Sequence, residues 1–162
     1  MEKMFVLLQF HFENNRNNLQ AEPMKKYMKD LFPFLGIKKP ERNKLLKQFY
    51  QQTGILKEDF HHEFVTKLWE QPEREYQYVA LDYLEKSLKK LSKEELPLIE
   101  RMITTKSWWD TVDMLASKPV GKIAKDHPEV IKETIEGWGV WGAFMVKKIS
   151  HPVSTQIQGS NR

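Results

Sequence analysis

The chain has 162 residues, of which 40% are hydrophobic and 30% charged, and this composition is typical of a folded globular protein rather than a disordered one. The formal net charge of +4 permits an anionic partner such as nucleic acid without requiring one. Cysteine is absent, which excludes disulfides, cysteine-ligated zinc and a cysteine nucleophile and favours a cytoplasmic location.

The first predicted helix lies at the N-terminus, in the run MFVLLQFHF. This run is too short to span a membrane and no signal-peptide cleavage site follows it, so no membrane partner is expected. Phe5, Leu8 and Phe12 fall at the spacing of one helix face. A second helix is predicted over residues 21–32, with Pro23 near its start. Its inner face is expected to consist of Met24, Tyr27, Met28 and Leu31.

Three further helices are predicted in the middle of the chain. The first begins near Pro40 and ends at Gly54, which suits a C-cap because glycine adopts the left-handed conformation readily. The second covers residues 58–71. The third covers residues 73–91 and carries lysines near its C-terminus, as the helix dipole favours.

The remaining predicted helices lie between residues 92 and 138. Ser92, with Glu95 three residues later, forms a capping-box pattern that predicts a helix start. Ser107 is expected to cap a helix over SWWDTVDMLA, and the last predicted helix covers residues 127–138. Residues 139–162 contain no acidic residue, and the stretch HPVSTQIQGSNR at their end has no helical stripe, so an irregular tail is expected over 139–162.

Short helices joined by short turns, with almost no strand signal, predict an all-α protein. Helices of this length favour antiparallel pairs stacked side by side in an α-solenoid. Because the sequence shows no sharp internal self-similarity, a compact helical bundle is the alternative architecture.

The stretch KSWWDTVD is the strongest candidate for a functional site. If it is helical, the side chains at core spacing are Trp108, Val112 and Leu115. Trp109 and Asp113 then share a different face, one turn apart. A tryptophan on a helix most often belongs to the core, and an aspartate near a helix start often only complements the dipole. A large indole outside the core stripe and beside a carboxylate is instead typical of a binding site.

The pair Trp109 and Asp113 suits a group that is cationic or becomes cationic during a reaction. An indole face attracts a cation, and a carboxylate within one turn stabilises the same charge. In glycosidic cleavage the sugar develops oxocarbenium character, and a carboxylate is its usual partner. A cationic, N-alkylated base is a good leaving group, so no general acid is needed to expel it.

The stretches AEPMKKYMKDLFPFLGIKKPER, LWEQPEREYQYVALDYLEK and KSWWDTVDMLA cover most of residues 1–138. In order and spacing they resemble the DNA alkylation repair glycosylases with HEAT-like repeats, the AlkD type. The resemblance implies an α-solenoid of HEAT-like helix pairs over residues 1–138, whose concave basic face holds double-stranded DNA. It also implies excision of cationic N3- and N7-alkylated purines.

On the matching positions, the resemblance implies site residues. Asp113 is expected to be catalytic, stabilising the developing sugar cation and orienting the hydrolytic water. Trp109 is expected to contact the lesion-bearing nucleotide. Lys148 falls where the family has an arginine that grips the DNA backbone, although lysine lacks the bidentate fork of arginine. Lys106, just before the tryptophan pair, is a candidate phosphate contact from its position alone.

The sequence departs from the family pattern after Trp138. Family members continue for several more helices and supply a second tryptophan, for which no counterpart is expected here. We therefore expect a C-terminally truncated or frameshifted chain, with a reading-frame shift between Gly137 and Gly142 that sequencing of the encoding DNA tests. An uncapped end of a solenoid predicts self-association. The alternative function is a non-catalytic helical-repeat module that binds DNA or protein.

The adjacent residues His61 and His62 are a feature that can suggest a metal site. Neighbouring histidines point in different directions on a helix, and no third ligand stands near them in the sequence. No metal is therefore expected. No glycine-rich phosphate-binding loop is visible either, and no cofactor is expected.

Overall fold

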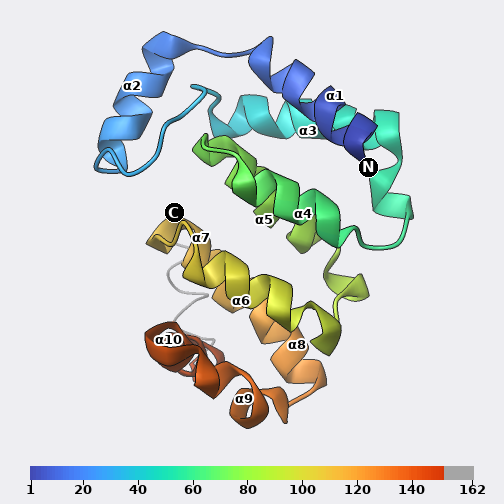
Figure 1. The fold of residues 1–162 in the computed structure, drawn as a ribbon, viewed down its shortest axis with the longest axis vertical. Helices are drawn as coiled ribbons and strands as arrows, with labels where there is room; N and C mark the ends of the chain where they lie inside the picture. The colour runs from blue at the N-terminus through green and yellow to red at the C-terminus, as the bar shows by residue number, and fades with distance from the viewer. Residues whose placement is uncertain (152–162) are drawn as a thin grey trace. The chain divides into compact units, whose positions relative to one another are not determined.

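The computed structural model describes residues 1–151. Within them the regular structure is helical and no strand is present, which confirms the predicted all-α class. The chain forms two compact units, Met1–Tyr83 and the part from Leu84 onward, which are described separately (Figure 1). The stacking of helix pairs into an α-solenoid stays a prediction.

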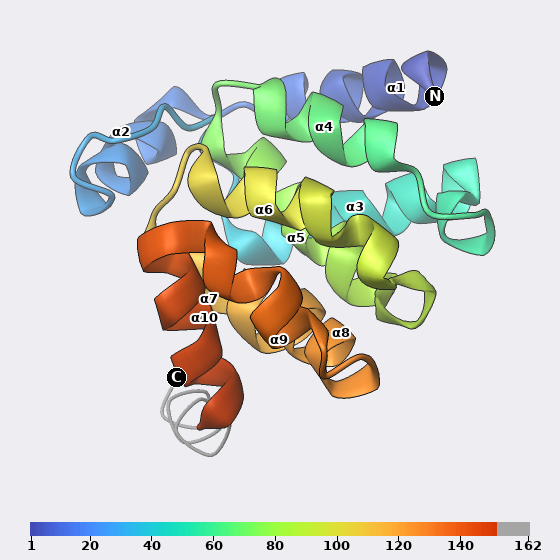
Figure 2. The same cartoon turned by 60° about the horizontal axis from the view of Figure 1, so that its bottom comes forward.

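In the first unit, α1 packs against other helices of the unit. Its helices are α1 (Glu2–Glu13), α2 (Asn18–Tyr27), α3 (Lys39–Thr53), α4 (His62–Glu70) and most of α5 (Arg74–Lys86). α1 lies against α3 and also beside α4, to which it is tied by an ion pair of 2.6 Å between Glu2 and Lys67 (Figure 2).

The apolar face of α1 is the one expected from the sequence. Phe5, Leu8 and Phe12 are 5%, 0% and 0% exposed, which confirms an amphipathic N-terminal helix. Phe12 stacks on Tyr76 of α5, with 5.5 Å between the ring centroids. α3 also ends as predicted, because Gly54 adopts the left-handed conformation with φ of 65°.

α2 is shorter than the predicted helix and buries a different face. It ends at Tyr27, because the chain turns back through Lys29 and Asp30, which are left-handed with φ of 56° and 59°. Tyr27 and Leu31 are therefore 87% and 47% exposed, whereas Met28 is buried. The predicted inner face was wrong at Tyr27 and Leu31, because it assumed a helix that continues beyond this turn.

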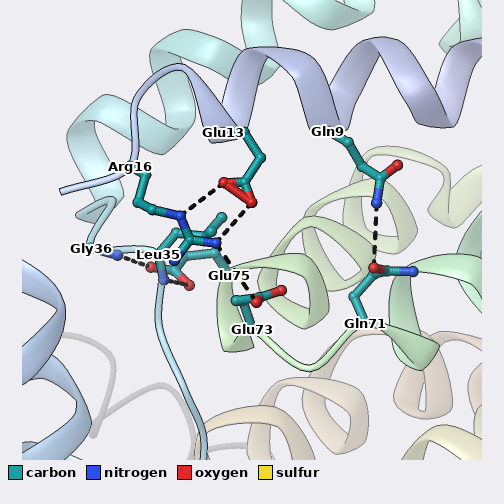
Figure 3. A network of polar contacts seen from close by, with 8 residues as sticks. All are labelled: Gln9, Glu13, Arg16, Leu35, Gly36, Gln71, Glu73 and Glu75. Atoms are coloured by element: carbon teal, nitrogen blue, oxygen red, sulfur yellow. Dashed lines mark hydrogen bonds and ion pairs between the residues drawn. The ribbon is translucent and has the colours of Figure 1, made fainter. Parts of the chain in front are cut away.

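A buried carboxylate anchors the loop that follows α2. Glu75 of α5 is fully buried and accepts hydrogen bonds from the backbone N–H groups of Leu35 and Gly36 at 2.8 and 2.9 Å (Figure 3). It also accepts one from the backbone N–H of Ile37 at 3.1 Å. Gly36 has φ of 96°, and a Cβ at this position would lie 1.9 Å from the carbonyl oxygen of Asn17. The loop therefore requires glycine for both its conformation and its space.

A second polar network joins the end of α1 to the start of α5. The Arg16 guanidinium donates two hydrogen bonds of 2.8 Å to the Glu13 carboxylate and lies 3.8 Å from a Glu73 carboxylate oxygen (Figure 3). These hydrogen bonds lower the pKa of Glu13 below its ordinary value. On the same side of α1, the Gln9 and Gln71 side chains are hydrogen-bonded at 3.4 Å.

The second unit contains the remaining α-helices of the described chain. They are α6 (Leu96–Thr104), α7 (Trp109–Leu115), α8 (Gly121–Asp126), α9 (Val130–Glu133) and α10 (Gly139–Ser150). The capping box predicted from Ser92 and Glu95 is present, in the turn that leads into α6. Within residues 1–151, no helix has the length and apolar character needed to cross a membrane.

The helix α10 corrects the expectation of an irregular tail. Residues 139–150 are helical, and Met145 of this helix is fully buried. Gly142 is a packing residue in this helix, since a Cβ there would lie 2.3 Å from the carbonyl oxygen of Ile135. The remainder of the expected tail, residues 152–162, lies outside the described residues.

Candidate functional site

The linker before α7 determines how this helix begins. Trp108 is the N-cap residue, with extended φ and ψ of −159° and 166° and no side-chain capping hydrogen bond. Ser107 was expected to be the cap, but its hydroxyl donates to the carbonyl of Ile103 at the end of α6. Lys106 is half-buried in this linker with a left-handed φ of 53°, and its predicted phosphate contact stays a prediction.

The two faces of α7 separate core residues from candidate site residues. Val112 and Leu115 are fully buried, as the spacing predicted, whereas Trp108 is only half-buried because it precedes the helix. Trp109 is 49% exposed, and the Asp113 side chain is 38% exposed. The indole and the carboxylate therefore lie outside the core stripe, as the sequence indicated.

Two rings of α10 join Trp109 to form an aromatic cluster, defined here as Trp109, Trp141 and Phe144. The centroid of the Trp109 ring lies 5.4 Å from that of Trp141 and 5.3 Å from that of Phe144. Trp141 and Phe144 are 6.1 Å apart, and all three contacts are edge-to-face, with interplanar angles of 64° to 88°. Aromatic pairs prefer such geometry, so the three rings stabilise one another.

An amine and a carboxylate meet beside the aromatic cluster. The Nζ of Lys148 lies 3.5 Å from Oδ1 of Asp113 and 5.6 Å from the centroid of the Phe144 ring. Lys148 follows Phe144 by one helical turn, which places both side chains on one face of α10. The Lys148 side chain is only 19% exposed, so the ion pair is partly shielded from water. The structure thus brings Lys148, which the sequence singled out on its own, to the predicted pair of Trp109 and Asp113.

A π-helical turn, η4 (Ala116–Val120), follows directly after α7. Pro119 lies in this turn, and a regular α-helix disfavours proline there because the residue has no N–H and its ring crowds the preceding turn. The Ser117 hydroxyl donates to the backbone carbonyl of Asp113 at 3.1 Å. Since η4 also packs against α10, it helps hold the Asp113 end of α7 beside Lys148.

The residues considered for a metal site make other contacts. The Nε2 of His61 lies 2.8 Å from a carboxylate oxygen of Glu58, at a partly exposed position. In the part of the chain that the structure describes, no group of three or more histidine, aspartate or glutamate side chains is arranged to hold a metal ion.

Trp141 and Phe144 were missed by the sequence reasoning. Together with Lys148 they have the spacing i, i+3 and i+7, which places them on one helix face and could have revealed the site. The pattern was overlooked because residues 139–162 were interpreted as an irregular tail. The second tryptophan was expected to be absent, yet Trp141 lies against Trp109.

Comparison with known proteins places these features in context. The model of a family described as DNA alkylation repair enzyme matches residues 8–150, which include all of α7 and α10. A solved structure described as a predicted DNA alkylation repair enzyme from Enterococcus faecalis is similar, with a TM-score of 0.65 and 28% sequence identity. That match covers 83% of this chain and 64% of the other, so this chain spans 64% of its relative's length. No curated protein matches the sequence.

Proposed function

Because the chain belongs to the DNA alkylation repair enzyme family, we propose that it excises cationic N3- and N7-alkylated purines from double-stranded DNA by hydrolysing the N-glycosidic bond. One observation carries this proposal. The exposed Trp109 indole and the Asp113 carboxylate lie on one face of α7, with the Lys148 amine 3.5 Å from the carboxylate. Such a surface can hold a positively charged base and stabilise the positive charge as it passes to the sugar.

The proposed reaction needs a group that stabilises positive charge on the sugar. Alkylation at N3 or N7 makes the purine cationic, so it leaves as a neutral base when its bond to C1′ breaks. The positive charge then passes to the deoxyribose as an oxocarbenium ion, for which a carboxylate is the usual partner. Water adds to C1′ and loses a proton to the Asp113 carboxylate or to solvent. The products are the free base and an abasic deoxyribose.

The aromatic cluster is suited to hold the cationic base. A cation over an indole is stabilised by about 0.5–1 kcal/mol at an exposed site and by about 2 kcal/mol when water is excluded. Trp141 and Phe144 contact Trp109 edge-on and restrict its rotamers, so less conformational freedom is lost when DNA binds. In this proposal Trp109 contacts the lesion, and the other two rings hold the indole in place.

Two lysines supply positive charge around the site. In this proposal Lys148, whose Nζ lies 3.5 Å from Oδ1 of Asp113, orients the Asp113 carboxylate. Lys106 precedes Trp109 by three residues and is assigned a contact to a backbone phosphate. Phosphate contacts of this kind release counterions from DNA, so binding should weaken as salt rises.

The test is release of 7-methylguanine from methylated duplex DNA. Asp113→Asn keeps the shape of the side chain and removes its charge. We expect it to lower the rate of release by about 10²–10³-fold, the usual loss when one group that stabilises transition-state charge is removed. Asp126→Asn is the matched control, because Asp126 also forms an ion pair with a lysine of the same unit, at 2.8 Å from Lys122. We expect this variant to retain the wild-type rate.

Two results separate the proposal from its alternative. Absence of release above background by the wild-type chain contradicts the glycosylase function. Salt-sensitive binding to duplex DNA without release would instead support a non-catalytic DNA-binding module.

A further inference from the structure

The ion pair of Lys148 and Asp113 places a potential nucleophile at the centre of the candidate site. The Lys148 side chain is 19% exposed, whereas the ion-paired lysines elsewhere in the second unit are 28% (Lys122), 50% (Lys118) and 52% (Lys93) exposed. The Lys148 amine lies 3.5 Å from the Asp113 carboxylate and 5.6 Å from the centroid of the Phe144 ring. Once its proton has passed to the neighbouring carboxylate, a lysine amine can react covalently with a carbonyl group.

We infer that Lys148 forms a Schiff base with the abasic deoxyribose and that the site has a second activity, an abasic-site lyase that cuts the strand by β-elimination. The inference rests on the proposed function, since base excision at Asp113 leaves an abasic sugar within reach of this amine. The sugar of an abasic site is in equilibrium with an open-chain aldehyde at C1′, which is a carbonyl substrate for a lysine amine. An arginine at this position could not react in this way, because its guanidinium does not lose its proton.

The first stage of the lyase reaction forms the covalent bond. Lys148 transfers a proton to the Asp113 carboxylate, and the neutral amine attacks C1′. The resulting carbinolamine takes the proton from the Asp113 carboxyl group and loses water, which leaves a protonated Schiff base and an ionised Asp113. No oxidant or reductant is needed, because every bond in this stage forms or breaks by transfer of an electron pair or a proton.

The second stage breaks the strand. The Asp113 carboxylate removes a proton from C2′, whose acidity is raised by the adjacent iminium group. The electrons form a double bond between C2′ and C3′, and the 3′-phosphate leaves with the C3′–O bond pair. Water then hydrolyses the Schiff base, which restores the Lys148 amine and releases the unsaturated aldehyde on the cut strand.

The test uses duplex DNA with a single preformed abasic site, produced by removing uracil from a defined position. The full chain is mixed with this end-labelled duplex and sodium borohydride, which reduces a Schiff base to a stable bond. We expect a covalent protein–DNA adduct on a denaturing gel, and mass spectrometry of its peptides should locate the bond on Lys148. Without borohydride, the same mixture should yield the β-elimination product.

Two variants separate the nucleophile from its neighbours. Lys148→Arg keeps the positive charge opposite Asp113 but should reduce the adduct to background. Lys147→Arg changes the exposed preceding lysine and should leave the adduct at the wild-type level. Thermal melting of both variants shows whether they fold. If Lys148→Arg does not fold, the position of the adduct in the wild-type chain decides the question.

Each remaining outcome counts for or against the inference. No adduct with the wild-type chain, or an adduct on a residue other than Lys148, overturns it. Because the substrate already lacks its base, trapping does not depend on glycosylase activity. Release of 7-methylguanine without trapping therefore refutes the lyase alone, and trapping without release refutes the proposed glycosylase alone.

Discussion

The substitution Gly36→Ala tests how the loop after α2 is held against α5. The new methyl group would lie 1.9 Å from the carbonyl oxygen of Asn17, and the residue would keep a φ of 96° that L-residues avoid. The conformational strain costs about 1–2 kcal/mol. Forcing an extra carbon into this packed position adds about 1–3 kcal/mol. We therefore expect the free energy of unfolding to fall by roughly 2–5 kcal/mol.

Gly54→Ala is the matched control for Gly36→Ala. Gly54 has a φ of 65°, but a Cβ there would meet nothing within 4 Å. This variant isolates the conformational strain, with a loss of about 1–2 kcal/mol. Alanine also reduces the conformational freedom of the unfolded chain by the same amount in both variants, so this contribution cancels in the comparison.

The assay for Gly36→Ala and Gly54→Ala is unfolding in urea followed by far-ultraviolet circular dichroism. Tryptophan fluorescence is less suitable, because four of the five tryptophans lie after residue 84 and Gly36 lies in the first unit. The shift of the midpoint at constant slope gives the change in free energy. Equal losses for the two variants would refute the argument that the contact with Asn17 makes glycine necessary.

Three further predictions follow from other contacts. Because Arg16 lowers the pKa of Glu13, the pair stabilises the fold above pH 4.5 and loses this effect as pH falls through the lowered pKa. The difference in melting temperature between wild type and Glu13→Gln should therefore shrink on acidification, and a difference that stays constant would contradict this role of the ion pair. Tyr50→Phe removes a hydrogen bond of 2.7 Å to the Asp82 carboxylate and should cost about 1.5–3 kcal/mol in urea unfolding, whereas an unchanged midpoint would show that this bond does not contribute. Trp141→Leu should keep cooperative melting but reduce the rate of 7-methylguanine release by roughly two- to tenfold, which corresponds to the loss of one aromatic contact. An unaltered rate would show that Trp141 does not contribute to the site.

Local features of the fold could be predicted from the sequence because their causes lie within a few residues. The stripe of Phe5, Leu8 and Phe12 reflects the helical period, and the left-handed end of α3 at Gly54 follows from glycine alone. The carboxylate of Glu75 could not be predicted in this way. Its hydrogen-bond donors lie 38 to 40 residues earlier in the chain, and only the folded structure brings them together.

The candidate site was predicted only in part, for a similar reason. Trp109 and Asp113 lie four residues apart, so helical spacing alone placed them on one face. Lys148 was identified because it falls where the resembled family has an arginine. Its ion pair with Asp113 could not be predicted, because it depends on how η4 and α10 pack in the folded chain. Trp141 was missed because residues 139–162 were interpreted as an irregular tail, whereas a helix begins at Gly139.

The π-helical turn η4 also controls the rotational phase between α7 and α8. Four buried residues lie at steps of four along this stretch: Val112, Ala116, Val120 and Ala124. In a straight α-helix each residue turns about 100°, so Ala124 would lie about 120° away from the direction of Val112. The wider π-helical turn rotates the chain by a smaller angle per residue, which offsets much of this rotation of about 120°. Loss of one residue from Ala116–Val120 would therefore rotate Trp109 and Asp113 away from α10, although none of the deleted atoms belongs to the site.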